Sequence, residues 1–172
     1  MKNKIISQRS ALDAALTYLS RRALTRYELI SRLERKGYSE AEIIETIERV
    51  EGWGYINDRN VALSFAQTKL ASYSQKRVNQ ELLRRGIAPE LVKEVLQDLY
   101  EPERELDQCT NLAKKMWSEE SRRWDKTYQY KKTYAYIPRE VFLKQKIGQK
   151  LMIKGYPQQV IRQALEESSG WN

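Results

Sequence analysis

Histidine is absent from this sequence of 172 residues, and cysteine occurs once, at Cys109. A single thiol cannot form a disulfide within the chain, and a chain without histidine cannot build a Cys/His zinc site or a triad that uses histidine as its base. Apolar runs of about 18 residues are also missing, so we expect no membrane-spanning helix. The first residues lack the apolar core of a signal peptide, which favours a reducing, cytoplasmic location.

Motifs of the common catalytic and nucleotide-binding folds are missing as well. The chain has no GxxxxGK[ST] phosphate loop and no GxGxxG, GxSxG or HExxH pattern. Carboxylates are plentiful, but they fall mostly on the surfaces of predicted helices, and Cys109 has no histidine that could activate it. We therefore expect a protein that is not an enzyme, that binds no cofactor or metal, and in which Cys109 is a buried structural thiol.

One short pattern occurs three times. It reads "ERKGYSEAEI", then "RRGIAPELV" and then "IKGYPQQVI", centred on Gly37, Gly86 and Gly155. Apolar residues stand four and eight positions before each glycine and six and ten positions after it, which is the spacing of one face of a helix. A glycine between two such helices fits a left-handed residue just past a helix end. Each copy therefore predicts a helix, a tight glycine turn and a second helix.

Further helix signals complete the repeat. Thr25 with Glu28 and Ser39 with Glu42 match the S/T-x-x-E capping box, and Ser74 is a predicted N-cap. Another helical stretch precedes each glycine-centred pair, and alternating β-branched runs are absent. We therefore predict an all-α protein of three tandem three-helix repeats stacked into an elongated body. The predicted repeats cover residues 8–57, 58–101 and 102–168, and the third contains an insertion near residues 117–138.

The last helix of the first two predicted repeats is acidic. Residues 40–51 carry five glutamates and one arginine, and residues 89–101 carry four acidic residues and one lysine. In a helix-turn-helix that reads DNA the last helix enters the major groove, where phosphates would repel these side chains. The sequence therefore disfavours sequence-specific DNA recognition of that kind.

Positive charge concentrates on the predicted middle helices and the insertion. The net charge is +8, and residues 122–154 alone carry ten basic against two acidic side chains. We expect stacking to bring the middle helices to a common side as a basic surface, although a solvated helix face explains such a charge run equally well. The twelve residues of this predicted surface are named the basic stripe: Lys76, Arg77, Arg84, Arg85, Arg122, Arg123, Lys131, Lys132, Lys144, Lys146, Lys150 and Lys154.

The insertion interleaves basic residues with six aromatic ones, namely Trp117, Trp124, Tyr128, Tyr130, Tyr134 and Tyr136. This mixture suits single-stranded nucleic acid, because bases stack on aromatic rings while phosphates pair with cations. The same rings could instead pack the core of an enlarged third repeat, and we expect at least half of them to do so. The larger glycine spacing, 69 residues against 49, predicts a longer first helix and a longer connector in that repeat.

Three segments, "ELISRLERKGYSEAEI", "GYINDRNVALSFAQ" and "RVNQELLRRGIAPELV", resemble the RecX family of recombinase regulators, and "KQKIGQKLMIKGYPQQVI" is similar to its closing repeat. The resemblance covers residues 11–166 and is most specific over residues 54–86, whereas the aromatic insertion is longer than the family pattern. It implies an elongated, curved helical body without catalytic activity. It also implies binding to the RecA recombinase filament on single-stranded DNA, with inhibition of its ATPase, strand exchange and co-protease activities.

The resemblance also suggests site residues. The positive surface of the family maps onto seven members of the basic stripe: Arg77, Arg84, Arg85, Lys144, Lys146, Lys150 and Lys154. Tyr55, Asn57 and Asp58 match the joint between the first two repeats, and we interpret them as structural. We expect a monomer that binds RecA and its nucleoprotein filament, with direct contact to single-stranded DNA left open.

Two other functions stay open at the level of sequence. A stand-alone basic protein could compete with the recombinase for single-stranded DNA, and its affinity would fall steeply with salt because phosphate contacts release counterions. A helical-repeat scaffold for a different partner is the third possibility. The sequence also leaves open whether a filament would be bound at its end or along its groove, and whether the effect is inhibition or activation.

Overall fold

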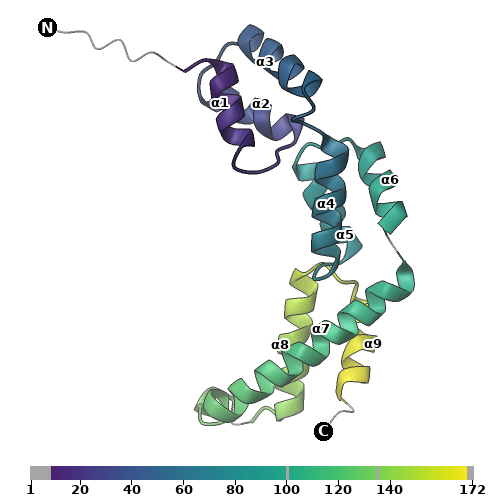
Figure 1. The fold of residues 1–172 in the computed structure, drawn as a ribbon. Helices are drawn as coiled ribbons and strands as arrows, with labels where there is room; N and C mark the ends of the chain where they lie inside the picture. Colours follow the sequence, from purple (N-terminus) through teal and green to yellow (C-terminus); the bar gives the residue numbers. More distant parts are fainter. Residues whose placement is uncertain (1–8, 100, 135, 170–172) are drawn as a thin grey trace, which may run out of the picture. The chain divides into compact units, whose positions relative to one another are not determined.

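The structure is a computed structural model that describes residues 9–99, 101–134 and 136–169, and within these ranges it contains helices and no strand (Figure 1). The predicted all-α class is therefore confirmed. The α-helices are α1 (Ala11–Leu19), α2 (Arg26–Arg35), α3 (Glu40–Gly52), α4 (Asp58–Leu70), α5 (Gln75–Arg84), α6 (Pro89–Leu99), α7 (Pro102–Arg123), α8 (Arg139–Ile153) and α9 (Gln158–Ser169). A π-helical turn (Trp124–Tyr128) and a 3₁₀ turn (Lys132–Tyr134) lie between α7 and α8. None of the described helices is both long and apolar enough to cross a membrane.

The chain divides into two compact units. Unit 1 comprises Met1–Phe65 and Glu81–Val95, and unit 2 comprises Ala66–Gln80 and Leu96–Asn172. The boundary falls inside α4, α5 and α6, so it cuts across the second predicted repeat. The boundaries of the three repeats and the curved, elongated shape therefore stay predictions.

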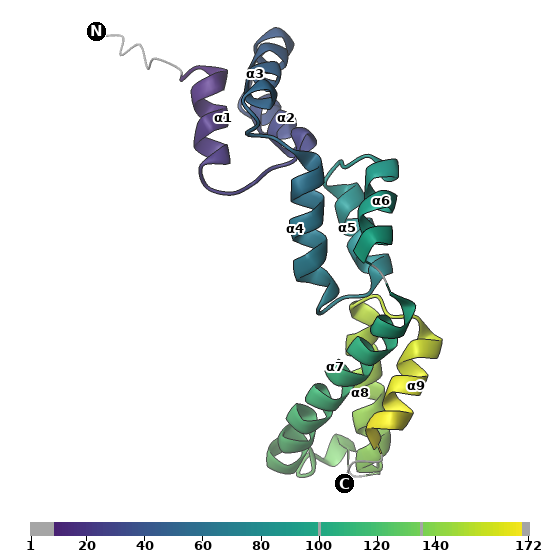
Figure 2. The same cartoon turned by 45° about the vertical axis from the view of Figure 1, so that its right-hand side comes forward.

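Unit 1 has its core between α1, α2 and α3 (Figure 2). The apolar positions spaced from Gly37 are all buried, with Leu29 and Leu33 inaccessible to solvent and Ile43 and Ile47 nearly so. Both predicted capping boxes are present, at the starts of α2 and α3. Local sequence signals therefore determine where these helices begin and which face they bury.

Unit 2 is built mainly from α7, α8 and α9, which lie side by side in both views (Figures 1 and 2). Helix α7 has 22 residues, against 9 in α1 and 13 in α4, which confirms the predicted longer first helix. Cys109 on α7 is fully buried in the core, where burial and then the nearby Glu105 raise the pKa of its thiol to about 12. A buried thiol that stays protonated is unreactive, as the sequence predicts.

Most aromatic residues of the insertion pack inward. The rings of Trp124, Tyr128 and Tyr134 surround Phe142, with centroid distances of 4.8–5.0 Å. Trp117 is half-buried against the same core. The two exceptions are Tyr130 and Tyr136, which are 76% and 96% exposed. The expectation that at least half of these rings form core is confirmed.

Candidate functional site

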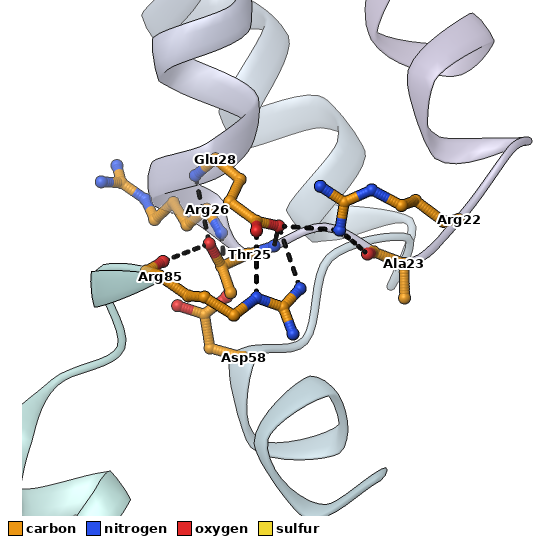
Figure 3. Close-up of polar contacts among 7 residues, drawn as sticks. All are labelled: Arg22, Ala23, Thr25, Arg26, Glu28, Asp58 and Arg85. Carbon is orange, nitrogen blue, oxygen red and sulfur yellow. Dashed lines mark hydrogen bonds and ion pairs between the residues drawn. The ribbon is translucent and has the colours of Figure 1, made fainter. Parts of the chain in front are cut away.

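The start of α2 meets the end of α5 in unit 1 (Figure 3). Thr25 is fully buried and is the N-cap of α2: its hydroxyl accepts from the backbone N–H of Glu28 at 3.1 Å. The same hydroxyl donates to the backbone carbonyl of Arg85 at 2.6 Å. One side chain therefore satisfies the free N–H of one helix and a carbonyl at the end of another.

A bidentate ion pair closes this contact. Arg85 donates from Nε and Nη2 to the two carboxylate oxygens of Glu28, both at 3.0 Å, and the two side chains are only 14% and 18% exposed. Burial raises the pKa of the Glu28 carboxyl, but the hydrogen bonds from Arg85 and from the backbone of Thr25 outweigh it, so the pKa lies below its usual value. The Arg85 guanidinium also lies 5.2 Å from the ring centroid of Phe65. The Arg85 side chain thus has a structural role in unit 1.

The joint residues Asn57 and Asp58 serve helix starts. Asn57 accepts from the backbone N–H of Asn60 at the start of α4, at 2.9 Å, and Asp58 accepts from the backbone N–H of Arg26 at 2.9 Å. Both residues therefore have the structural roles that the sequence suggested. Tyr55 is 58% exposed, and its ring lies edge-on to another exposed aromatic ring 5.9 Å away.

The glycine turn after α5 is pressed against α2. Gly86 has φ +76°, and a Cβ added to it would overlap Cβ and Cγ of Tyr27. Only glycine combines this conformation with this approach. The first junction is defined here as the contact made by Thr25, Glu28, Asp58, Arg85 and Gly86.

Unit 2 repeats this arrangement with different side chains. The backbone N–H of Ser74 donates to the carbonyl of Lys154 at 3.1 Å, and that of Gln75 donates to the carboxylate of Glu105 at 3.1 Å. Gly155 has φ +90°, and an added Cβ would lie 2.6 Å from the hydroxyl oxygen of Ser74. The second junction consists of Ser74, Gln75, Glu105, Lys154 and Gly155.

The basic residue of the second junction, Lys154, forms no ion pair with a carboxylate within the described residues. Arg77 stands where Glu28 stands in the first junction, three residues after the N-cap. The ammonium group of Lys154 instead donates to the carbonyl of Ser72 at 3.2 Å and lies 4.5 Å from the ring centroid of Tyr73. Lys154 is therefore also held by internal contacts.

Three further members of the basic stripe converge on one buried carboxylate. Glu120 on α7 is inaccessible to solvent, and its oxygens lie 2.5 Å from Nζ of Lys150, 3.2 Å from Nζ of Lys146 and 3.2 Å from Nη1 of Arg123. Burial raises the pKa of Glu120, but the hydrogen bonds from Lys150 and Lys146 outweigh it and lower the pKa overall. Part of the positive charge of these three residues therefore balances the buried negative charge of Glu120.

Two other members of the stripe pair with surface carboxylates on their own helices. Arg84 is 65% exposed and 3.7 Å from Glu81, and Lys144 is 38% exposed and 2.7 Å from Glu140. Surface pairs of this kind hold their partners weakly, at about 0–1 kcal/mol. The other exposed members are Lys76, Arg122, Arg123 and Lys131, whereas Arg77 is half-buried. Lys132 belongs to the 3₁₀ turn, and its side chain lies outside the described part of the structure.

A hollow of about 440 Å³ opens on unit 2 between the second half of α7, the start of α8 and the end of α9. Its lining residues are Lys114, Trp117, Ser118, Ser121, Arg122, Arg139 and Ser168. Only Arg122 belongs to the basic stripe, so the sequence analysis missed Lys114 and Arg139. The signal was present, because the five lining residues from α7 are spaced i, i+3, i+4, i+7 and i+8 on one helical face.

Charge is distributed unequally between the units. Unit 2 contains 17 basic and 11 acidic residues in its sequence, whereas unit 1 contains 14 basic and 12 acidic residues. Among the described residues, no group of three or more His, Cys, Asp or Glu side chains converges as a metal site would require. What the described side chains offer is a set of cations and aromatic rings on unit 2, suited to binding an anion.

Two family models match the chain. One is described as "RecX, first three-helix domain" and matches residues 11–49, and the other is described as "RecX, second three-helix domain" and matches residues 57–96. Tandem three-helix domains are therefore shown for this part of the chain. A crystal structure of RecX from Lactobacillus salivarius has the same fold, with a TM-score of 0.64 at 24% identity over 92% of this chain and 94% of that chain.

Relatives from several bacteria carry the name "Regulatory protein RecX". The protein from Caldanaerobacter subterraneus subsp. tengcongensis is 35% identical over 111 residues, 64% of this chain and 56% of its own length. The present chain thus spans little more than half of that relative. The protein from Chlorobium phaeobacteroides is 33% identical over 140 residues, 78% of this chain and 86% of its own length. Because the match extends over most of both chains, the chain belongs to the RecX family of regulatory proteins.

Proposed function

We propose that this protein is a non-enzymatic regulator of the RecA recombinase. It binds the filament that RecA forms on single-stranded DNA and inhibits its ATPase, strand exchange and co-protease activities. The observation that supports this is membership of the RecX family over most of the chain. The positive excess of unit 2 supports it as well, because a nucleoprotein filament is a polyanion that attracts such a surface.

The contacts of the regulator come from the solvent-facing members of the basic stripe. Arg84 is the best single candidate, because its guanidinium is 65% exposed and its only described ion pair is a long one to Glu81. Arg85, next to it, is a poorer candidate because it is only 14% exposed and is paired with Glu28 in the first junction. These contacts favour Arg84 over Arg85, although the sequence treats the two neighbouring arginines alike.

The first experiment is a titration of the ATPase rate of a preformed RecA filament on single-stranded DNA. We expect inhibition at well below one protein per recombinase subunit, at a salt concentration where free DNA is scarcely bound. Inhibition that begins only as the free DNA becomes saturated would contradict filament regulation and identify a competitor for DNA. Repeating both titrations at higher salt separates the two further, because phosphate-driven binding to single strands weakens with a log–log slope of about −0.7 per neutralised phosphate.

Charge reversal then locates the surface. We expect Arg84→Glu to raise the dose of protein needed for half-inhibition by about tenfold, which corresponds to roughly 1.4 kcal/mol. Lys93→Glu is the matched control, because Lys93 is exposed on the acidic helix α6, outside the basic stripe. Equal potency of the two variants, with unchanged helicity by circular dichroism, would show that Arg84 is not a contact.

A further inference from the structure

The hollow on unit 2 has the components of a site for a phosphate. Two guanidinium groups, Arg122 from α7 and Arg139 from the first turn of α8, line the same space, together with an ammonium group and the hydroxyl of Ser121. Arginine is suited to phosphate because its planar fork of N–H donors matches two phosphate oxygens at once. These lining residues come from separate helices of one core, so their spacing is set by the packing of unit 2.

In both guanidinium groups Nε lies near an oxygen of unit 2. Arg122 donates from Nε to the backbone carbonyl of Ser118 at 3.2 Å, and Nε of Arg139 lies 3.5 Å from the carboxylate of Asp125. The terminal nitrogens Nη1 and Nη2 are therefore the groups that a ligand would contact. An arginine held at Nε, as Arg122 is, loses less freedom on binding than a fully mobile one, so this side of the hollow is partly organised for its ligand.

The hollow also has an aromatic side. Trp117 packs against the core of unit 2 and lines the same space as Arg122, which is five residues further along α7. Aromatic faces next to cations are typical of proteins that bind single strands, where a base stacks on the ring and the phosphate pairs with the cation. The volume of about 440 Å³ lies within the range of roughly 300–1,000 Å³ usual for small-molecule sites.

We propose that this hollow binds one nucleotide unit of single-stranded DNA, with the phosphate at Arg122 and Arg139 and the base against Trp117. An acidic peptide would satisfy the cations but would leave the indole without a stacking partner, so the combination favours a nucleotide. The site acts without RecA, and its test needs no recombinase. Failure of this inference and failure of the proposed regulatory function are therefore distinguishable.

The test measures binding of fluorescein-labelled (dT)15 to the whole 172-residue chain by fluorescence anisotropy. We expect Arg122→Ala and Arg139→Ala each to weaken binding about fivefold at low salt, and to reduce the salt slope by about 0.7 for each phosphate that is no longer neutralised. Arg162→Ala is the matched control, since it removes one exposed positive charge from α9 outside the hollow. We expect it to change the affinity less than twofold.

The tryptophan is tested by fluorescence of the wild-type protein and of a Trp117→Phe variant. Saturating (dT)15 should quench part of the emission of the wild-type protein, and Trp117→Phe should remove that part. Free thymidine monophosphate at millimolar concentration should displace the oligonucleotide, whereas inorganic phosphate alone should do so less well. Equal loss of affinity in the Arg122 and Arg162 variants, or tighter binding of a poly-glutamate peptide than of (dT)15, would overturn the assignment.

Discussion

The two junctions solve the same packing problem with different chemistry. In both, a left-handed glycine lies against the start of a helix, and a carboxylate accepts from the first free N–H of that helix. Only the first adds a bidentate ion pair, between Glu28 and Arg85. In the second, Lys154 finds a backbone carbonyl and an aromatic ring instead. The shared part is therefore backbone geometry, and the ion pair is an addition specific to unit 1.

The largest loss of stability is expected from substituting the left-handed glycine, which both junctions share. Gly86→Ala forces a side chain into the left-handed region, at about 1–2 kcal/mol, and into Tyr27, where overpacking adds about 1–3 kcal/mol. Gly37→Ala is the matched control, because Gly37 has φ +84° with nothing within 4 Å of an added Cβ, so only the first cost applies. Chemical denaturation measures both, and equal losses would show that the close approach at Gly86 is tolerated.

A smaller loss of stability is expected from removing the ion pair, which only the first junction has. Arg85→Ala leaves the half-buried Glu28 with the backbone N–H of Thr25 at 3.2 Å and the 3.5 Å contact to Arg22, and should lower the free energy of unfolding by about 2 kcal/mol. Lys154→Ala removes one hydrogen bond and one ring contact, and should cost about 1 kcal/mol. If the lysine variant were the less stable of the two, the ion pair would not be what distinguishes the junctions.

The smallest effect is expected on the stability of the folded protein at low pH. The pKa of Glu28 is lower in the folded protein than in the unfolded chain, where it is about 4.3, so the unfolded chain binds more protons and stability is lost as the pH falls through this region. Glu28→Gln should therefore flatten the decline in melting temperature below about pH 5. Glu45→Gln, which alters a carboxylate that is 72% exposed, is the control and should follow the wild-type curve.

Local features of the fold were predictable because they depend on residues three or four apart. The capping residues Thr25 and Ser39, the left-handed glycines and the buried face of α2 all follow from such spacings. The Glu28–Arg85 pair joins residues 57 positions apart and has no local signature. The long α7 was predictable from the glycine spacing, whereas the details of the turns that follow it were not.

The candidate site, unlike the local features of the fold, was mostly not predictable from the sequence. Counting charges predicted a basic stripe. The sequence cannot show that the buried Glu120 pairs with two lysines of this stripe, or that Arg85 is only 14% exposed. Burial decides whether a cation can meet a partner, and burial depends on tertiary packing. Conversely, Arg139 lies far from Trp117 in the chain and reaches the hollow only because α8 packs on α7.

The hydrogen bond from Thr25 to Arg85 also has a kinetic consequence. It closes a loop of 60 residues, whereas the cap of α2 closes one of three. Loop-closure entropy grows with length, so we expect helices and caps to form early and the first junction to form after the transition state for folding. Variants of Glu28 and Arg85 should therefore accelerate unfolding and leave the folding rate almost unchanged, which makes this contact a determinant of how long the protein stays folded.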